Sequence, residues 1–142
     1  MVPTIGADPE LFLVDKSGSW KSAVGLVGGS KTYPAPMGRP GFFVQEDNVT
    51  VEFNIPPAHS ADEFVESIGW TVTQLKEVLG SLGFEVRPTA SAYFSDAELA
   101  SPEAQAFGCT PDFNAWKFGS MNPRPDPHST SLRSCGGHVH FG

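Results

Sequence analysis

Side chains that can bind metal ions alternate with other residues in three separate segments of this chain. The pairs are Asp8 and Glu10, Glu52 and Asn54, and His138 and His140. In an extended strand, residues two apart point to the same face of the sheet. The interleaved Phe53, Val139 and Phe141 would then point to the opposite face. The pattern predicts a sheet with one apolar face and one face that carries metal ligands.

Length and charge narrow the class of protein. The 142 residues suffice for a single domain, residues 1–142, with its own hydrophobic core. Sixteen Asp and Glu outnumber nine Lys and Arg, and no basic cluster is present, so we expect no nucleic acid partner. The apolar runs are shorter than the roughly 18 residues of a membrane span, and no signal peptide is indicated. We expect a cytoplasmic protein without membrane contact.

Two hairpins and a long loop are predicted in the first part of the chain. Residues 10–14 and 20–27 read as strands on either side of a turn at 16–19. Residues 28–41 are rich in Gly and Pro and predict a long loop, a kind of segment that is often functional. Residues 42–45 and 49–54 then form a second hairpin across a turn at 46–48.

One helix is predicted from Ser60 to Leu82. Ser60 and Glu63 form a capping box, apolar residues then recur at helical spacing, and Gly83 ends the helix. Its apolar stripe is expected to cover the apolar face of the sheet. The stripe includes Phe64, Ile68, Leu75 and Leu79. Residues 84–87 and 91–94 are predicted strands, residues 108–132 are predicted to be mostly irregular, and residues 137–142 return to strand.

The acidic pairs are candidates for a divalent metal site. Asp8, Glu10 and Glu52, with the amide oxygen of Asn54, are the hard oxygen ligands that Mg²⁺ or Mn²⁺ uses when it holds phosphates. The alternative is that these groups are solvated charges at the edge of a sheet. Pro9 cannot donate to a neighbouring strand, which favours an edge or a bulge for this segment.

The histidine pair is a candidate for the same site. His138 and His140 follow Gly136 and Gly137, where a backbone or a ligand can approach closely. Two histidines at this spacing are more typical of a site than of a core, although a hydrogen-bonded core histidine is the alternative for each.

Basic residues are few in the last third of the chain. They are Lys117, Arg124 and Arg133. Any phosphate bound by this part of the chain must use some of them. Arg133 lies five residues before His138, where it is placed to meet an anion, and its alternative role is that of a surface cation.

Other metal and nucleophile chemistries remain open at this stage. Cys109, Cys135, His138 and His140 have the ligand types of a structural zinc site, but their spacing is not that of a zinc finger. Two histidines and a carboxylate also suit non-haem iron. Cys135 is the one candidate for a nucleophile beside a base, and whether Cys109 and Cys135 form a disulfide is left open.

Four ordered segments resemble those of a known family. They are GADPE at residues 6–10, EFNIPP at 52–57, GCTPDFN at 108–114 and RSCGGHVHFG at 133–142. In this order they resemble the phage-encoded carboxylate-amine ligases of type 2, which belong to the glutamine synthetase and glutamate-cysteine ligase superfamily.

The resemblance implies an α+β, glutamine-synthetase-like fold, in which a curved and mostly antiparallel sheet carries helices on one face. Its concave face would bind Mg²⁺ or Mn²⁺ and ATP, activate a small-molecule or peptide carboxylate as an acyl phosphate, and let an amine displace the phosphate. The metal ligands that the resemblance implies are Asp8, Glu10, Glu52 and His138, and the alternation of the strand adds His140 as a candidate. A divalent ion would neutralise charge on the transferring phosphoryl group, and Arg133 and Lys117 are the cations expected to contact ATP and to stabilise the remaining charge.

One departure from the family pattern concerns length. The relatives that the resemblance suggests continue beyond the Gly-His-x-His strand, so we expect this chain to be the N-terminal part of a ligase catalytic domain. The alternative is a non-catalytic phage structural or binding protein built on the same sheet, located in the virion. A homo-oligomer and phage particle proteins remain open as partners, and the carboxylate and amine are not identified.

Overall fold

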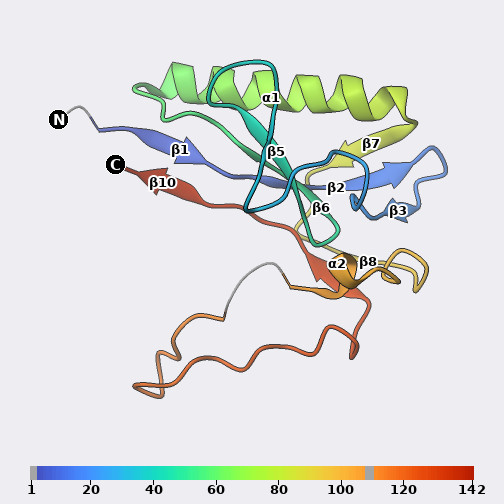
Figure 1. Ribbon diagram of the computed structural model, residues 1–142. Helices are drawn as coiled ribbons and strands as arrows, with labels where there is room; N and C mark the ends of the chain where they lie inside the picture. Colours follow the sequence, from blue (N-terminus) through green and yellow to red (C-terminus); the bar gives the residue numbers. More distant parts are fainter. Residues whose placement is uncertain (1–2, 108–110) are drawn as a thin grey trace.

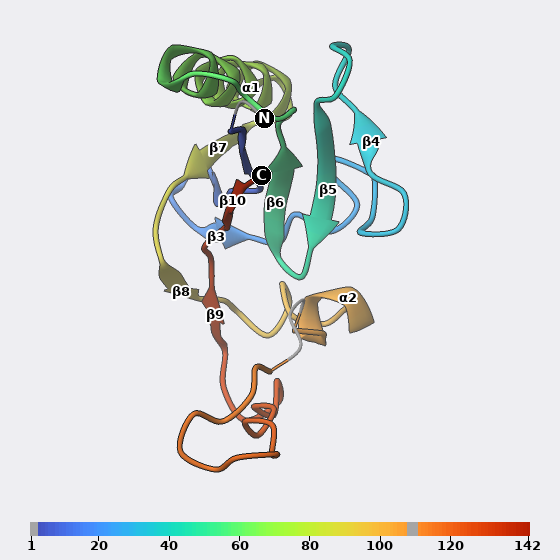
Figure 2. The same cartoon turned by 90° about the vertical axis from the view of Figure 1, so that its left-hand side faces the viewer.

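A long helix lies along one face of a curved antiparallel sheet, and an irregular lobe lies beyond the opposite face (Figures 1 and 2). This computed structural model describes residues 3–107 and 111–142. The strands are β1 (Ile5–Ala7), β2 (Glu10–Asp15), β3 (Trp20–Lys21), β4 (Ala35–Pro36), β5 (Phe43–Asp47), β6 (Thr50–Asn54), β7 (Phe84–Arg87), β8 (Ser91–Tyr93), β9 (Leu132–Ser134) and β10 (Val139–Phe141). The helices are α1 (Ala61–Ser81) and the single turn α2 (Pro102–Gln105). The α+β fold with a curved antiparallel sheet is confirmed.

Strand β2 organises the sheet. It pairs antiparallel with β3, β6 and β7, and the sheet continues from β6 through β5 to β4. Two smaller sheets join β1 to β10 and β8 to β9. Because β1 leads directly into β2, and β10 pairs with β1, the first and last strands of the described chain lie side by side (Figure 1).

The segment around Pro9 lies in the middle of the sheet, so the prediction of an edge is wrong. The Pro9 carbonyl accepts a hydrogen bond from Phe53 of β6, and the Ala7 carbonyl accepts one from Ile55, just after β6. On the other side, the N–H groups of Asp8 and Glu10 donate to the carbonyls of His138 and Gly136. Pro9 has no N–H to donate toward β6, and the strand is interrupted at this point, between β1 and β2.

Helix α1 begins and ends where the sequence predicts. The Ser60 hydroxyl accepts from the N–H of Glu63 at 3.1 Å, and the Glu63 carboxylate accepts from the N–H of His59 at 2.7 Å. The carboxylate thus bonds one residue before the cap rather than to Ser60 itself. Gly83 follows the helix with a φ of 90°, a value that favours glycine.

Side chains along β2 point alternately to the two faces of the sheet, and each face has its own hydrophobic core. Leu11 and Leu13 face α1 and pack with Leu75 and Leu79. Phe12 points to the opposite face and forms a smaller cluster with residues of β8, α2 and their neighbours. This second cluster attaches the irregular lobe to the face of the sheet that also carries Glu10.

Several elements differ from the sequence-based bounds. The strand predicted over 20–27 is limited to β3, because residues 24–27 form turns. Strand β5 runs through Asp47, two residues farther than predicted. The segment 111–131 is irregular as predicted, and residues 108–110 lie outside the described residues. Among the described residues, no helix is both long and apolar enough to cross a membrane.

Candidate metal centre

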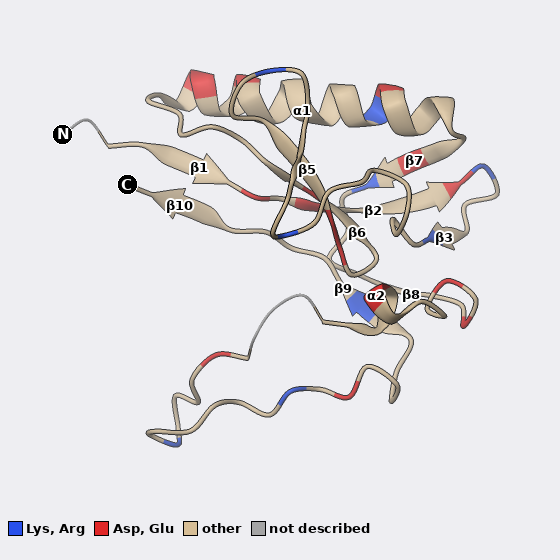
Figure 3. Ribbon diagram, viewed as in Figure 1, with Lys and Arg blue, Asp and Glu red and all other residues tan. Residues whose placement is uncertain are grey.

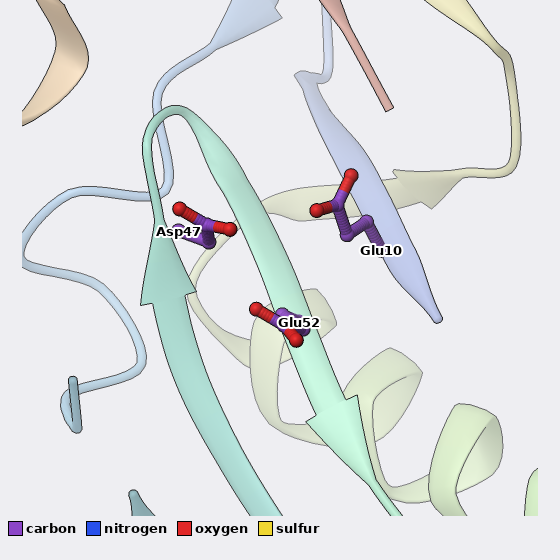
Figure 4. Close-up of side chains that lie close together, drawn as sticks. All are labelled: Glu10, Asp47 and Glu52. Atoms are coloured by element: carbon purple, nitrogen blue, oxygen red, sulfur yellow. The ribbon is translucent and has the colours of Figure 1, made fainter. Parts of the chain in front are cut away.

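Three carboxylates from three strands converge on the sheet face opposite α1. Glu10, Asp47 and Glu52 each offer an oxygen, and these oxygens lie within 4.8 Å of one another. Figure 4 shows the three side chains pointing into a common space between β2 and the β5–β6 hairpin. Acidic segments of these strands also meet near the middle of the sheet in Figure 3. We call this cluster the acidic triad.

Strand register explains why the triad forms. Glu10 lies directly opposite Glu52 across β2 and β6, and Glu52 lies opposite Gln45 across β6 and β5. Asp47 is two residues beyond Gln45 on β5, so it shares the same face. Residues that are distant in sequence are therefore fixed on one patch by backbone pairing.

Burial disfavours the ionised form of two carboxylates of the triad, those of Glu10 and Glu52. Burial raises the pKa of Glu10, and the negative charges of Asp47 and Asp8 add to that effect, although a hydrogen bond from the Gly136 N–H opposes it. Burial likewise raises the pKa of Glu52, again with the charges of Asp47 and Asp8 adding to the shift. A cation placed among these oxygens would relieve this repulsion.

Hydrogen bonds hold two of the three carboxylates in place. The Gln45 side-chain amide donates to Oε2 of Glu52 at 2.8 Å. The Gly136 N–H donates to Oε2 of Glu10 at 2.8 Å. In a metal site, such partners fix the direction in which the remaining carboxylate oxygen points.

Asp8 joins the two histidines to the site. Its carboxylate accepts from the His138 N–H at 2.6 Å, and the Nδ1 atom of His138 lies 3.2 Å from the same oxygen. The Nε2 atom of His140 lies 3.3 Å from the other Asp8 oxygen. Both imidazoles are mostly exposed. Gly137, with a φ of 147°, allows this approach, because a Cβ there would lie 2.8 Å from the Cα of Pro9.

A cavity of about 510 Å³ covers the candidate site. The acidic triad, Asp8 and His138 all line it, so the structure brings four of the five predicted metal ligands to one cavity and adds Asp47. The fifth, His140, reaches the site through its contact with Asp8. The basic residues in the lining are Lys31, Arg124 and Arg133.

Arg133 is buried and engaged with the backbone. It is 1% exposed, and its guanidinium donates to the carbonyl oxygens of Ala104, Thr130, Leu132 and Pro127. These bonds use four of the five N–H donors of an arginine. Arg133 thus organises the lobe around it, and its contact with phosphate stays a prediction.

Other residues singled out in the sequence lie in different surroundings. Lys117 is exposed in the segment between α2 and β9, and it is not among the described residues that line the cavity. Burial, with the charge of Glu10, raises the pKa of the Cys135 thiol to about 12, so this thiol is a poor nucleophile at neutral pH. Cys109 lies outside the described residues.

Two residues of the site were not predicted from the sequence. Asp47 was assigned to the turn of the second hairpin, although its spacing of two from Gln45 would have placed it on the Glu52 face if the strand had been extended. Lys31 lies in the long loop between β3 and β4, and its ammonium nitrogen is 2.8 Å from Oδ2 of Asp47. No local sequence pattern predicts that contact.

Ligand chemistry indicates the kind of ion that fits. The triad offers only carboxylate oxygens, which suits Mg²⁺ or Mn²⁺ rather than zinc or copper. The histidine beside Asp8 could complete a Mn²⁺ site more readily than a Mg²⁺ site.

Comparison with known protein families gives a match over most of the chain. A family model described as glutamate-cysteine ligase family 2 matches residues 4–128, a range that includes Asp8 and the acidic triad. No curated protein and no solved structure is similar enough to the chain to count as a match.

Proposed function

Because the chain belongs to glutamate-cysteine ligase family 2, we propose that it acts as an ATP- and metal-dependent ligase that joins a carboxylate to an amine through an acyl phosphate. Ligases of this family are ATP-dependent and typically use divalent metals. The observation that carries the proposal is the acidic triad, three converging carboxylates within a region matched by the family. We also propose, from the resemblance of its sequence segments, that the chain is a phage-encoded enzyme of type 2.

In this proposal Glu10, Asp47 and Glu52 hold Mg²⁺ or Mn²⁺, with Asp8 and His138 at the border of the site. The bound ion would neutralise charge on the triphosphate of ATP. The protein's own contribution is to fix the carboxylate oxygens through the bonds from Gln45 and Gly136. The basic residues that line the cavity are available to the phosphates, and Arg133 and Lys117 remain proposed contacts.

The proposed reaction has two steps. A carboxylate oxygen of the first substrate attacks the γ-phosphorus of ATP, the bond to the β-γ bridging oxygen breaks, and ADP leaves. The amine nitrogen of the second substrate then attacks the carbonyl carbon of the acyl phosphate. The carbon–oxygen bond to phosphate breaks, inorganic phosphate leaves, and the nitrogen loses a proton to give the amide.

The test is coupled ADP release from the protein expressed from its complete reading frame, with Mg²⁺ or Mn²⁺ and a panel of amino acids and amines. We expect substrate-dependent ADP release. Glu10→Gln removes one charge from the triad without changing side-chain size, and it should lower turnover by roughly 10²-fold or more. The matched control is Glu66→Gln on the exposed surface of α1, which should retain turnover.

One outcome would contradict the ligase proposal, and another would contradict the assignment of Glu10 to the metal site. Absence of ADP release across the whole panel would favour the non-catalytic alternative, a structural or binding protein. Full turnover in Glu10→Gln would remove Glu10 from the metal site while leaving ligase activity in place.

A further inference from the structure

Lys31 brings a positive charge to the acidic triad. Its ammonium lies 2.8 Å from Oδ2 of Asp47, whose side chain is only 11% exposed. Lys31 lines the cavity described above and also a second cavity of about 680 Å³. Asp8 and Glu52 line both cavities as well. Lys31 therefore stands where the two cavities meet, against the carboxylates proposed to hold the metal.

The loop that carries Lys31 is fixed to the sheet on both sides of it. Before Lys31, the Glu46 carboxylate accepts from the N–H groups of Gly25, Val27 and Gly28 at 2.9 to 3.2 Å. After Lys31, the short strand β4 pairs with β5. Such anchors distinguish Lys31 from a mobile surface lysine.

The backbone next to Lys31 is also closely packed. Gly29 has a φ of 76°, and a Cβ there would lie 2.5 Å from the carbonyl oxygen of Val44. Ser30 and Tyr33 exchange backbone hydrogen bonds at 3.0 and 3.1 Å, which forms a tight turn around Lys31. The backbone thus holds the ammonium beside the triad, although the Lys31 side chain is 48% exposed to solvent.

The whole triad acts on Lys31. Burial lowers the pKa of its ammonium, but the hydrogen bond and charge of Asp47, followed by the charges of Glu52 and Glu10, outweigh burial, so the pKa is raised. In return, the charge of Lys31 opposes the rise in pKa at Glu10 and Glu52. One lysine therefore serves as counter-charge to all three carboxylates.

We propose that Lys31 is the resident counter-ion of the acidic triad, that it competes with a divalent metal ion for the carboxylate of Asp47, and that metal binding moves it away from Asp47. This inference rests on the proposed function, because it takes the triad as the metal site. An ammonium at hydrogen-bond distance and a metal ion cannot occupy the same lone-pair direction of one oxygen. The divalent ion carries twice the charge and coordinates several oxygens, so it wins once its concentration is sufficient.

Competition of this kind predicts that removal of Lys31 strengthens metal binding. We propose to measure binding of Mn²⁺ by the loss of its free-ion electron paramagnetic resonance signal, with Mg²⁺ as competitor. Lys31→Met keeps most of the aliphatic chain and removes the charge. It should raise Mn²⁺ affinity about three- to fivefold, the upper part of the range for one partly exposed charge pair.

Two matched variants control for charge. Lys31→Arg retains the positive charge and should bind Mn²⁺ within about twofold of the wild type. Lys76→Met makes the same charge change at an exposed position of α1, which packs on the opposite face of the sheet, and should also stay within about twofold. Unchanged or weaker Mn²⁺ binding in Lys31→Met would overturn the inference, the first because no competition exists and the second because Lys31 would then be needed to shape the site.

A second measurement follows the lysine itself. Acetylation of the folded protein with a limiting reagent, read by mass spectrometry, reports how accessible each amine is. Saturating Mg²⁺ should increase labelling of Lys31 relative to Lys16 and Lys76, two exposed lysines elsewhere in the structure. Equal labelling of Lys31 with and without Mg²⁺ would show that it stays on Asp47 and would overturn the inference.

These readouts separate this inference from the proposed function. If the wild type binds Mn²⁺ and releases ADP while Lys31→Met binds Mn²⁺ equally well, the inference fails and the ligase proposal stands. If neither the wild type nor Lys31→Met binds Mn²⁺, the triad is not a metal site, and both fail. Tighter Mn²⁺ binding in Lys31→Met without ADP release supports the inference and removes only the catalytic proposal.

Discussion

At Glu52, burial and neighbouring negative charge act in the same direction. The residue is 7% exposed, and both effects raise the pKa of its carboxyl group. A carboxyl group whose folded pKa is raised binds protons more tightly in the folded than in the unfolded state. Folding stability of the metal-free protein therefore falls as pH rises from the ordinary value of 4.5 through the raised value, and the full penalty remains above it.

Glu52→Gln should remove that penalty. The Gln45 amide can still donate to the new side-chain oxygen, so the variant is expected to be more stable than wild type by roughly 0.5 to 1 kcal/mol at about pH 8. The advantage should shrink toward about pH 5, where the wild-type carboxyl group is increasingly protonated. Thermal unfolding with a chelator present, repeated across this pH range, is the measurement. A lower melting temperature for the variant at the alkaline end would show that the ionised carboxylate is stabilising.

The spacing of polar residues in the sequence predicted part of the candidate site. Asp8, Glu10, Glu52 and His138 were found because alternation in a strand needs no knowledge of the partner strand. Asp47 was missed because hairpin ends are set by the turn, and a shift of two residues moved it from strand to turn. Arg133 donates to three carbonyls within six residues of it and to one distant carbonyl, that of Ala104, whose position no local pattern encodes.

Among the elements, α1 is the clearest case of a prediction that holds. Leu75 and Leu79 are buried, and Phe64 and Ile68 pack against the same cluster. The capping residues and the helical period agree, so local and tertiary preferences coincide. The long loop before β5 is the opposite case, because its course depends on the Glu46 carboxylate and on pairing with β5.

Leu75→Ala tests the packing of α1. Leu75 is 3% exposed, and its truncation should lower the free energy of unfolding by roughly 2 to 5 kcal/mol because it leaves a cavity against the sheet. Val78→Ala, on the same helix but 57% exposed, is the control and should cost below about 0.5 kcal/mol. Chemical denaturation of both variants gives the comparison. Equally small losses of unfolding free energy in both variants would mean that the apolar stripe of α1 does not pack against the core.

On the scale of the whole molecule, Arg133 connects parts of the lobe that share no sheet. Its guanidinium joins α2 at Ala104 to the segment that leads into β9. Arg133→Met should remove the donor to one buried carbonyl, that of Ala104, which keeps its bond from Asn48, and to three part-buried carbonyls, at a cost of roughly 2 to 4 kcal/mol. Hydrogen exchange should show lost protection in residues 94–107 and 127–134, with α1 unaffected.

The control for Arg133 is Arg87→Met. Arg87 pairs with Glu85 on the surface, where both side chains are at least half exposed, so its loss should cost within about 0.5 kcal/mol. The role in phosphate binding that the sequence suggests for Arg133 predicts a different result. In that case Arg133→Met would keep its exchange protection and lose affinity for ATP.

The contact between the start of the sheet and the segment before β10 has a consequence for the order of folding. The Glu10 and Asp8 carboxylates accept from Gly136 and His138, which are 126 and 130 residues away in the chain. The acidic triad, by contrast, lies wholly within the region that ends with β6. During synthesis the triad can therefore assemble early, while Asp8 and the neighbouring strand edge wait for almost all of the remaining chain. We therefore expect the site to form in two stages, separated by the time the ribosome takes to translate the chain from α1 to the segment before β10.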